Sequence, residues 1–215
     1  MARPRGARTR ATAVLEELKA IYPDAHCALD HENAYQLLAA TILSAQCTDE
    51  RVNMVTPALF ARYPTPAALA GADQEAVEEL VRSTGFFRSK AKNLIGMAQA
   101  VEARFDGEIP TELADFVTLP GVGRKTGNVV RSVWFDLPGL PVDTHVTRLS
   151  HRLRLTAEDD PVKIEHDLGG MLPPEEWGRF SLRLIEHGRR VCDARKPRCG
   201  ACTLAGACPS AGTFG

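Results

Sequence analysis

The sequence contains few aromatic residues, almost no net charge and no long apolar run. Aromatic side chains make up 6% of its 215 residues, and Ala, Leu, Glu and Arg recur without the period-two alternation of strands. A formal net charge of −1 gives no global sign of a polyanionic partner, so only local clusters can indicate one. No apolar run approaches the roughly 20 residues that span a bilayer, and the basic start leads into an amphipathic segment instead of a signal-peptide core. We therefore expect an all-α, soluble, intracellular protein without a membrane partner.

Length and one stiff break suggest the domain organisation. A chain of 215 residues with 44% hydrophobic content can form one large domain or two small ones with packed cores. The segment Pro138-Gly139-Leu140-Pro141 is the best internal candidate for a crossing between domains. The first ten residues carry four arginines and no acid, which predicts a disordered basic tail over residues 1–9. A basic arm that touches phosphates is the alternative.

Several helix starts are marked by residues that commonly cap helices. Thr65, Asp73, Ser89 and Asp160 each precede an apolar pattern with helical spacing, and proline follows Thr65 and Asp160 at the first helical position. No repeat longer than a helix pair and no low-complexity tract interrupts this pattern. The chain is therefore expected to be a succession of ordinary amphipathic helices.

The stretch 119–128, Leu-Pro-Gly-Val-Gly-Arg-Lys-Thr-Gly-Asn, places a glycine hairpin between two predicted helices. Their apolar faces are formed by Leu113, Phe116 and Val117 before the hairpin and by Val129, Val130, Val133 and Trp134 after it. Gly121 and Gly123 let the turn adopt positive φ and leave room for an anion at the N–H groups of the second helix. An ordinary interhelical turn is the alternative, and the other motifs must decide between the two.

Four cysteines near the C-terminus form the pattern C-x6-C-x2-C-x5-C, with members Cys192, Cys199, Cys202 and Cys208. Thiols this close in a short segment favour a metal over disulfides, because nothing indicates secretion. Zinc usually takes two short C-x-x-C pairs, whereas only one is present here, so the spacing favours a cubane iron–sulfur cluster and leaves zinc open. Cys27 and Cys47 lie apart and are expected to be small buried residues.

A lysine and a carboxylate are candidates for chemistry. Lys125 lies at the start of the second predicted helix, and Asp143 follows within Val142-Asp143-Thr144-His145. Like charge from Arg124 and Arg131, together with partial burial, is expected to favour the neutral amine that a nucleophile needs. A surface phosphate contact is the alternative role of the lysine, and a helix N-cap is that of the carboxylate.

A basic cluster overlaps the cysteine-rich segment. Seven basic residues stand against two acids, and they are Arg179, Arg183, Arg189, Arg190, Arg195, Lys196 and Arg198. Such runs are usually solvated surface, but this one borders a loop that a metal would hold rigid. We therefore expect it to contact phosphates.

Together these motifs resemble the endonuclease III group of DNA glycosylases, which are helix-hairpin-helix enzymes with an iron–sulfur loop. The resemblance runs from about Tyr35 to Cys208 and includes Leu43-Ser44-Ala45-Gln46 followed by Thr48-Asp49. It implies a two-domain, all-α fold with a six-helix barrel over residues 28–137 and an iron–sulfur cluster domain formed by residues 1–27 and 138–215.

The resemblance also implies a bifunctional DNA glycosylase and AP lyase of base excision repair. Such an enzyme would remove oxidised pyrimidines from duplex DNA and nick the abasic site by β-elimination through a lysine Schiff base. Its partner would be double-stranded DNA with damaged bases or abasic sites. We expect it to act as a monomer in the cytoplasm, associated with the nucleoid if the source is bacterial.

The resemblance further implies roles for individual residues. Lys125 would be the nucleophile and Asp143 its acidic partner, and the four clustered cysteines would hold a [4Fe-4S] cluster. Gln46 would enter the space left by the flipped base, while the turn 85–88 would wedge into the base stack. DNA contacts are implied for Gln46, Phe86, Phe87, Arg88, Gly121, Gly123, Arg124, Thr126, His145 and Arg190.

This sequence departs from the family pattern at the wedge, where leucine, tyrosine and asparagine are replaced by Phe86, Phe87 and Arg88. A bulkier wedge with an added charge predicts a changed opposite-base preference or affinity. Three alternatives are a monofunctional glycosylase of the same superfamily, a non-catalytic helix-hairpin-helix module and a zinc-bound redox or structural protein. The first generally lacks the hairpin lysine and carries an extra C-terminal domain, whereas this chain has Lys125 and ends shortly after Cys208.

Overall fold

Every regular element of the described chain is helical. The computed structural model describes residues 3–213, and over this range the chain forms α-helices and short 3-10 helices without a strand. The all-α prediction is therefore confirmed. None of these helices is long and apolar enough to cross a membrane. The chain divides into two compact units, the central unit, Cys27–Leu137, and the terminal unit, Met1–His26 with Pro138–Gly215.

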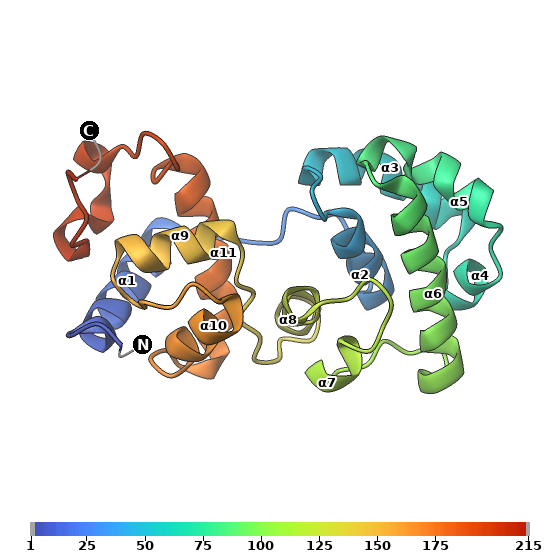
Figure 1. Ribbon diagram of the computed structural model, residues 1–215, viewed down its shortest axis with the longest axis horizontal. Helices are drawn as coiled ribbons and strands as arrows, with labels where there is room; N and C mark the ends of the chain where they lie inside the picture. The colour runs from blue at the N-terminus through green and yellow to red at the C-terminus, as the bar shows by residue number, and fades with distance from the viewer. Residues whose placement is uncertain (1–2, 214–215) are drawn as a thin grey trace. The chain divides into compact units, whose positions relative to one another are not determined.

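The central unit is organised around the long helix α6. Its elements are α2 (Ala34–Leu43), α3 (Asp49–Arg62), α4 (Pro66–Ala70), α5 (Gln74–Val81), η1 (Arg82–Thr84), α6 (Phe87–Phe105), α7 (Leu113–Phe116) and α8 (Arg124–Val133). Helices α4 and α5 pack along α6, while α2 contacts α3, α6 and α8 (Figure 1). Every residue of α2 except Gln36 is buried. Helix α2 is therefore the centre of this unit's core.

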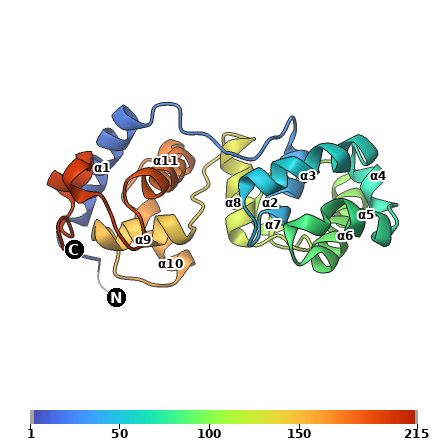
Figure 2. The same cartoon turned by 90° about the horizontal axis from the view of Figure 1, so that it is seen from above.

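The terminal unit combines the first helix of the chain with its last third. Its elements are α1 (Ala7–Ile21), α9 (Thr144–Arg152), α10 (Pro161–Gly169), η2 (Pro174–Glu176), α11 (Trp177–Arg190), η3 (Cys199–Ala201) and η4 (Thr203–Ala207). Helix α11 packs against both α1 and α9 (Figure 2). Leu18, Leu149 and Phe180 meet in this core and are almost completely buried. The C-terminal segment thus has a helical base from which its cysteines extend.

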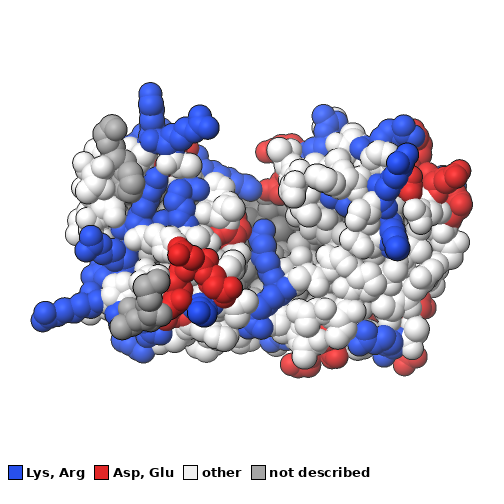
Figure 3. Space-filling model, in the orientation of Figure 1, with Lys and Arg blue, Asp and Glu red and all other residues white. Residues whose placement is uncertain are grey.

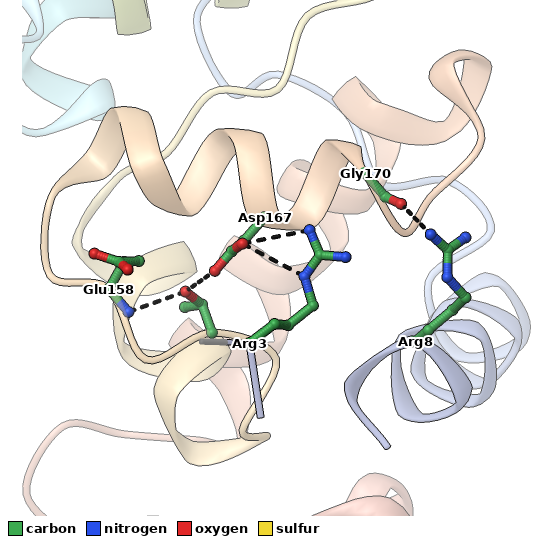
Figure 4. A network of polar contacts seen from close by, with 6 residues as sticks. Arg3, Arg8, Glu158, Asp167 and Gly170 are labelled. Atoms are coloured by element: carbon green, nitrogen blue, oxygen red, sulfur yellow. Dashed lines mark hydrogen bonds and ion pairs between the residues drawn. The ribbon is translucent and has the colours of Figure 1, made fainter. Parts of the chain in front are cut away.

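The predicted disordered tail is wrong from Arg3 onward. Helix α1 already begins at Ala7, and Arg3 forms an ion pair of 3.3 Å with Asp167 of α10 (Figure 4). Arg8 donates a hydrogen bond of 2.6 Å to the carbonyl oxygen of Gly170, the C-cap of α10. The arginines therefore have partners at the end of α10, where cations and donors are favourable. The first two residues lie outside the described part of the chain.

Three of the four predicted helix caps are confirmed. Thr65, Asp73 and Asp160 each accept a hydrogen bond from the backbone N–H three residues later. Ser89 is wrong as a cap, because α6 begins at Phe87 and Ser89 lies exposed inside its first turn. The preceding backbone turns through positive φ, so the helix starts earlier than its polar residues indicate.

Two apolar residues of the predicted hairpin faces are exposed instead of buried. Val117 is 46% exposed and Trp134 is 41% exposed, since each follows the last residue of its helix and turns away from the core. Trp134 packs edge-on against His31, with ring centroids 6.0 Å apart. The hairpin core depends on Phe116 and Val130, which are completely buried.

The prediction that Arg183 belongs to the exposed basic cluster is wrong, because only 6% of its surface is exposed. Its guanidinium lies 2.8 Å from Glu176 and also donates to the carbonyl oxygen of Tyr22. Burial raises the pKa of Glu176, but the charge and hydrogen bonds of Arg183 and Lys19 outweigh it, so the net pKa is lowered. This network connects η2 and α11 to α1 within the terminal unit.

Candidate functional site

The predicted helix-hairpin-helix is present at residues 113–133. Gly121 has φ +75, and a Cβ there would lie 2.7 Å from the Cβ of Asn93 in α6. Gly123 has φ −93 and ψ 174, so the positive φ of the turn is at Gly121 and not at Gly123. An added Cβ at Gly123 would meet nothing within 4 Å. Gly121 therefore permits the turn, whereas Gly123 keeps the start of α8 open.

Close packing of α7 against α8 depends on a third glycine, Gly127, to which the sequence pattern gave no role. A Cβ at this position would lie 2.7 Å from Leu113 Cδ1 and 2.9 Å from Phe116 Cβ. Because both neighbours belong to the core of the hairpin, α7 can approach α8 this closely only at a glycine. The spacing of glycine within an otherwise apolar helix face is the signal that could have identified it.

The N-terminus of α8 combines N–H groups that no cap side chain covers with an accessible amine. Gly123 is its N-cap and provides no side-chain hydrogen bond, so the first-turn N–H groups have no side-chain cap. These groups and the helix dipole attract anions. Lys125 is exposed, which makes the expected partial burial wrong, while Arg124 and Thr126 are half-buried. This end of α8 can hold an oxyanion next to a primary amine.

Asp143 caps α9 in the way its sequence position predicts. Its Oδ1 accepts a hydrogen bond of 2.8 Å from the N–H of Val146. Its second oxygen accepts no hydrogen bond from the described residues and is thus available to a ligand. His145, one residue into α9, has its Nδ1 3.0 Å from Arg148 Nη2 and close to Gly188 of α11. That ring nitrogen is engaged within the terminal unit.

Gln46 lies on a fixed turn after α2. It is exposed and left-handed, with φ 53, an unusual conformation for a residue with a side chain. The turn is closed by two hydrogen bonds, from Ser44 Oγ to the carbonyl oxygen of Thr41 and from the N–H of Cys47 to that of Ser44. The amide of Gln46 therefore projects from a well-defined position in the central unit.

Only Gly85 and Phe86 of the predicted wedge segment 85–88 precede α6. Gly85 and Phe86 both have positive φ, and Phe86 is 68% exposed. Phe87 is already the first residue of α6, and the guanidinium groups of Arg82 and Arg88 each lie 5.6 Å from the centroid of its ring. The prediction of one continuous turn is therefore wrong beyond Phe86, which is the exposed aromatic residue of this segment.

The four clustered cysteines line one pocket of the terminal unit. Cys192 follows α11, Cys199 and Cys202 lie at the two ends of η3, and Cys208 follows η4. All cysteines of the chain are free thiols, so the disulfide alternative has no support. The pocket encloses about 330 Å³ of empty space, part of it open to solvent, and is otherwise lined by Arg152, Val191, Pro197, Arg198, Ala205, Ser210 and Ala211.

Two residues that the sequence analysis missed place donors beside the thiols. Arg152 Nη1 lies 3.1 Å from Cys192 Sγ, and the same guanidinium donates to the carbonyl oxygens of Asp193 and Ala194. His187 Nε2 lies 3.4 Å from Cys202 Sγ. Arg152 is distant in sequence and gave no local signal, whereas His187 could have been identified by its place on the apolar face of α11.

The electrostatics of the pocket suit a cationic, sulfur-binding group. Burial raises the pKa of Cys202, and so do the other three cysteines, while a hydrogen bond from the N–H of Leu204 lowers it. Burial likewise raises the pKa of Cys208, which the N–H of Ser210 lowers. Four thiolates at such close quarters therefore require positive charge between them.

A buried hydrogen-bond chain orients His187 toward the pocket. Tyr22 Oη lies 3.1 Å from Nδ1 of His187, and His187 is only 2% exposed. Burial lowers the pKa of His187 and raises that of Tyr22, so a neutral imidazole faces a protonated phenol. When Tyr22 donates to Nδ1, the proton of the ring is on Nε2 and points at Cys202. This arrangement fits a thiolate acceptor.

The arrangement of the thiols bears on which metal group they could hold. Within residues 3–213, no three His, Cys, Asp or Glu side chains are grouped around one metal ion. The structure thus shows four free thiols around one pocket, which are donors that a metal group can use.

Positive side chains are concentrated near this pocket. Figure 3 shows Lys and Arg side chains gathered on the visible face of the terminal unit. Arg190, in the last turn of α11, is 66% exposed at its side chain, pairs with Glu186 at 2.6 Å and lies over the ring of Tyr22. The other exposed members of the predicted basic cluster are Arg179, Arg189, Arg195, Lys196 and Arg198.

Known proteins share both the fold and the motifs of this chain. The family model described as HhH-GPD superfamily base excision DNA repair protein matches residues 39–174. Endonuclease III of Synechocystis sp. is 57% identical over 205 residues, which cover 95% of this chain and 94% of the relative. The chain belongs to the endonuclease III family. Members of this family are bifunctional DNA glycosylases and AP lyases of base excision repair.

Solved structures of endonuclease III agree with this assignment. A non-covalent endonuclease III–DNA complex superimposes with a TM-score of 0.91 at 40% identity, covering 96% of this chain and 97% of that chain. A trapped endonuclease III–DNA covalent intermediate gives the same values. The family resemblance predicted from the hairpin, the 142–145 motif and the cysteine spacing is therefore confirmed.

Proposed function

We propose that this bifunctional DNA glycosylase and AP lyase removes oxidised pyrimidines from duplex DNA with Lys125 as its nucleophile. The observation that carries the proposal is the exposed amine of Lys125 beside the glycine-capped N-terminus of α8. This placement would bring a primary amine next to a bound phosphate. A relative of 40% identity has been trapped as a covalent intermediate with DNA, which is the outcome expected of a nucleophilic mechanism.

The hairpin would bind one DNA strand through a phosphate. Its first-turn N–H groups point at an opening that Gly123 leaves free of a side chain. Arg124 and Thr126 would add side-chain donors at the same end of α8. In the terminal unit, Arg190 and His145 are proposed as further DNA contacts. Such contacts carry no sequence information and so suit an enzyme that must inspect any sequence.

A damaged base must leave the stack before the amine can reach its sugar. Flipping costs a few kcal/mol and is easiest for a poorly stacked base, which favours lesions over normal bases. Phe86 would insert into the base stack, and the amide of Gln46 would occupy the vacated space. Both residues are exposed and lie on turns whose backbone is fixed by hydrogen bonds.

Base release would be the first chemical step. The departing base takes the electron pair of the glycosidic bond, and positive charge develops at C1′ of the sugar. The Asp143 carboxylate would stabilise this charge, while the nitrogen lone pair of neutral Lys125 forms a bond to C1′. The C1′–O4′ bond then breaks with its electron pair going to O4′, and the nitrogen loses two protons, one of them replaced on O4′, which gives an imine between Lys125 and C1′.

Strand cleavage follows from that imine. Its protonated form withdraws electrons and acidifies the C2′ hydrogen, so a proton acceptor can remove this hydrogen as a proton. The C3′–O bond breaks, and its electron pair leaves with the 3′ phosphate, which is a β-elimination. Hydrolysis of the imine finally returns Lys125 as a free amine. These steps use only groups of the chain, the DNA and water.

We further propose that Cys192, Cys199, Cys202 and Cys208 hold a [4Fe-4S] cluster. Support comes from the four free thiols around one pocket and from the donors that Arg152 and His187 direct at two of them. When bound, the cluster would supply structural cross-linking of a loop that bears Arg195, Lys196 and Arg198. No catalytic step requires it.

Substitution of Asp143 separates its proposed catalytic charge from its role as the cap of α9. Asp143→Asn keeps a side chain that caps α9 but removes the negative charge, whereas Asp143→Ala removes both. We expect Asp143→Asn to melt like the wild type and to release a damaged base roughly 100-fold more slowly. The measurement is single-turnover base release from a duplex with one oxidised pyrimidine. An unchanged rate in Asp143→Asn would contradict the proposed role.

The choice of lesion is tested with a panel of duplexes that each contain one defined modified base. Oxidised pyrimidines should be released faster than oxidised or alkylated purines, and a preference for purines would overturn the proposed substrate class. Because the substrate is genomic DNA, the enzyme would work in the cytoplasm at the nucleoid in a bacterial cell.

A further inference from the structure

Lys90 is the only buried lysine among the described residues, with 4% of its surface exposed. It lies in the first turn of α6, where its Nζ donates a hydrogen bond of 2.7 Å to the carbonyl oxygen of Thr84. Its backbone N–H donates a hydrogen bond of 3.0 Å to the carbonyl oxygen of Phe86. The amine of Lys90 therefore holds the residue before Gly85, while its backbone N–H forms a first-turn hydrogen bond of α6 with Phe86.

The turn between these two contacts is intrinsically unfavourable. Gly85 has φ 71 and ψ 155, a region that only glycine populates readily. Phe86 has φ 48 and ψ 29, which is left-handed and strained for a residue with a Cβ. No side chain caps the start of α6, and the Phe86 ring gains little from burial because it is 68% exposed. Other interactions must hold this conformation.

Burying an ammonium group for this contact is also unfavourable. Burial lowers the pKa of Lys90, while the nearby Cys47 opposes the shift. No carboxylate of the described residues forms an ion pair with Lys90, and its hydrogen-bond acceptor there is a neutral carbonyl. A methionine would fill similar space without the cost of desolvation. The amine is therefore suited to holding Thr84, a task that an apolar side chain cannot perform.

A second exposed turn lies beside the same lysine. Cys47 directly follows Gln46, the residue with φ 53 after α2, and lies close enough to Lys90 to influence it electrostatically. The residue that follows Gln46 thus affects the charge of the amine that holds the Phe86 turn.

We propose that Lys90 is a positioning residue that holds the Gly85-Phe86 turn so that Phe86 is presented to the base stack. This inference rests on the proposed role of Phe86 in base flipping. Lys90 itself is not proposed to contact DNA, and it acts through the hydrogen bond of its amine to the carbonyl oxygen of Thr84. Loss of the amine should leave the fold of the central unit intact and relax the turn.

The test is a double-mutant cycle with Lys90→Met and Phe86→Ala, in which single-turnover base release is measured on fully paired duplex. Phe86→Ala should slow base release about tenfold, because unstacking is no longer assisted. Lys90→Met should slow it by a similar factor and should have no further effect, within about twofold, in the Phe86→Ala background. The exposed Lys92 lies in the same helix, so Lys92→Met removes one charge without touching the turn and serves as the matched control.

The cycle distinguishes a wrong role for Phe86 from a wrong role for Lys90. If Phe86→Ala releases the base at the wild-type rate, the proposed role of Phe86 is wrong. If Phe86→Ala is slow but Lys90→Met slows it further by the same factor as in the wild type, Lys90 acts elsewhere and the inference is overturned. Should Lys90→Met not fold, Lys90→Gln is placed in the same cycle, since its amide is uncharged and shorter. Fluorescence of 2-aminopurine beside the lesion gives a second readout, and it should fall in Lys90→Met if unstacking is lost.

Discussion

Gly121 and Gly123 have different tasks although they share one hairpin. Gly121 needs its positive φ and its missing Cβ, because Asn93 leaves no room for a side chain. Gly123 has extended backbone and open space in front of it. The sequence predicts two glycines with the same function, since a G-x-G pattern carries no information about which φ each residue adopts.

This difference predicts that alanine at Gly121 mainly affects stability, whereas alanine at Gly123 mainly affects DNA binding. Gly121→Ala should lower the free energy of unfolding by about 1–3 kcal/mol, because it combines a left-handed backbone with a 2.7 Å contact. Gly123→Ala should cost less than about 1 kcal/mol but weaken DNA binding, since its methyl group enters the anion site. Thermal melting and equilibrium binding to an abasic-analogue duplex measure the two effects. Equal destabilisation of both variants would contradict this division.

Lys90 and His187 show the limit of prediction for single residues. Both are buried, and each makes its decisive contact with a group that no local sequence pattern connects to it. Lys125 and Asp143 could be singled out because each occupies a recognisable helix start. Their local structures agree with that expectation apart from the exposure of Lys125, and their roles in catalysis stay predictions.

Helix ends were predictable where a polar side chain performs the capping. Thr65, Asp73 and Asp160 satisfy backbone N–H groups by a local hydrogen bond, so composition and position suffice. The start of α6 was not predictable, because two residues with positive φ replace the cap there. The N-terminal arginines were mispredicted for a related reason, as Arg3 has its partner in α10.

The cysteine loop is the element whose order should depend most on a bound group. We expect the purified protein to be brown and to contain about four irons per chain. Cys202→Ser should lose iron and the visible absorption band, and the loop should become sensitive to protease. Cys27→Ser is the matched control, because Cys27 packs in the central unit and should leave iron content unchanged. Stoichiometric zinc with a colourless wild-type protein would contradict the cluster.

The two compact units correspond to one interrupted and one continuous stretch of the chain. The central unit is continuous and the terminal unit combines α1 with residues from Pro138 onward. The proline-rich break at 138–141 is a local signal for this change, whereas the return of α1 to α11 is a long-range contact that no local pattern contains. The all-helical fold was predictable because helical periodicity runs through nearly the whole chain, and it is confirmed.

Family membership and chemistry depend on the combination of motifs. A hairpin, a capped acid and four cysteines are each common, but their order in one chain is typical of endonuclease III, and the comparisons confirm it. The proposed chemistry depends on one covalent bond, which Lys125 forms to the sugar.

The most direct test is reduction of the reacting complex with borohydride, followed by peptide mapping of the adduct. An imine between enzyme and DNA is reduced to a stable amine, so the attacking residue keeps the sugar through digestion and mass spectrometry. We expect one adduct, on the peptide that contains Lys125, and its loss in Lys125→Gln, a variant that should still bind DNA. An adduct on another amine, or undiminished trapping in Lys125→Gln, would contradict it.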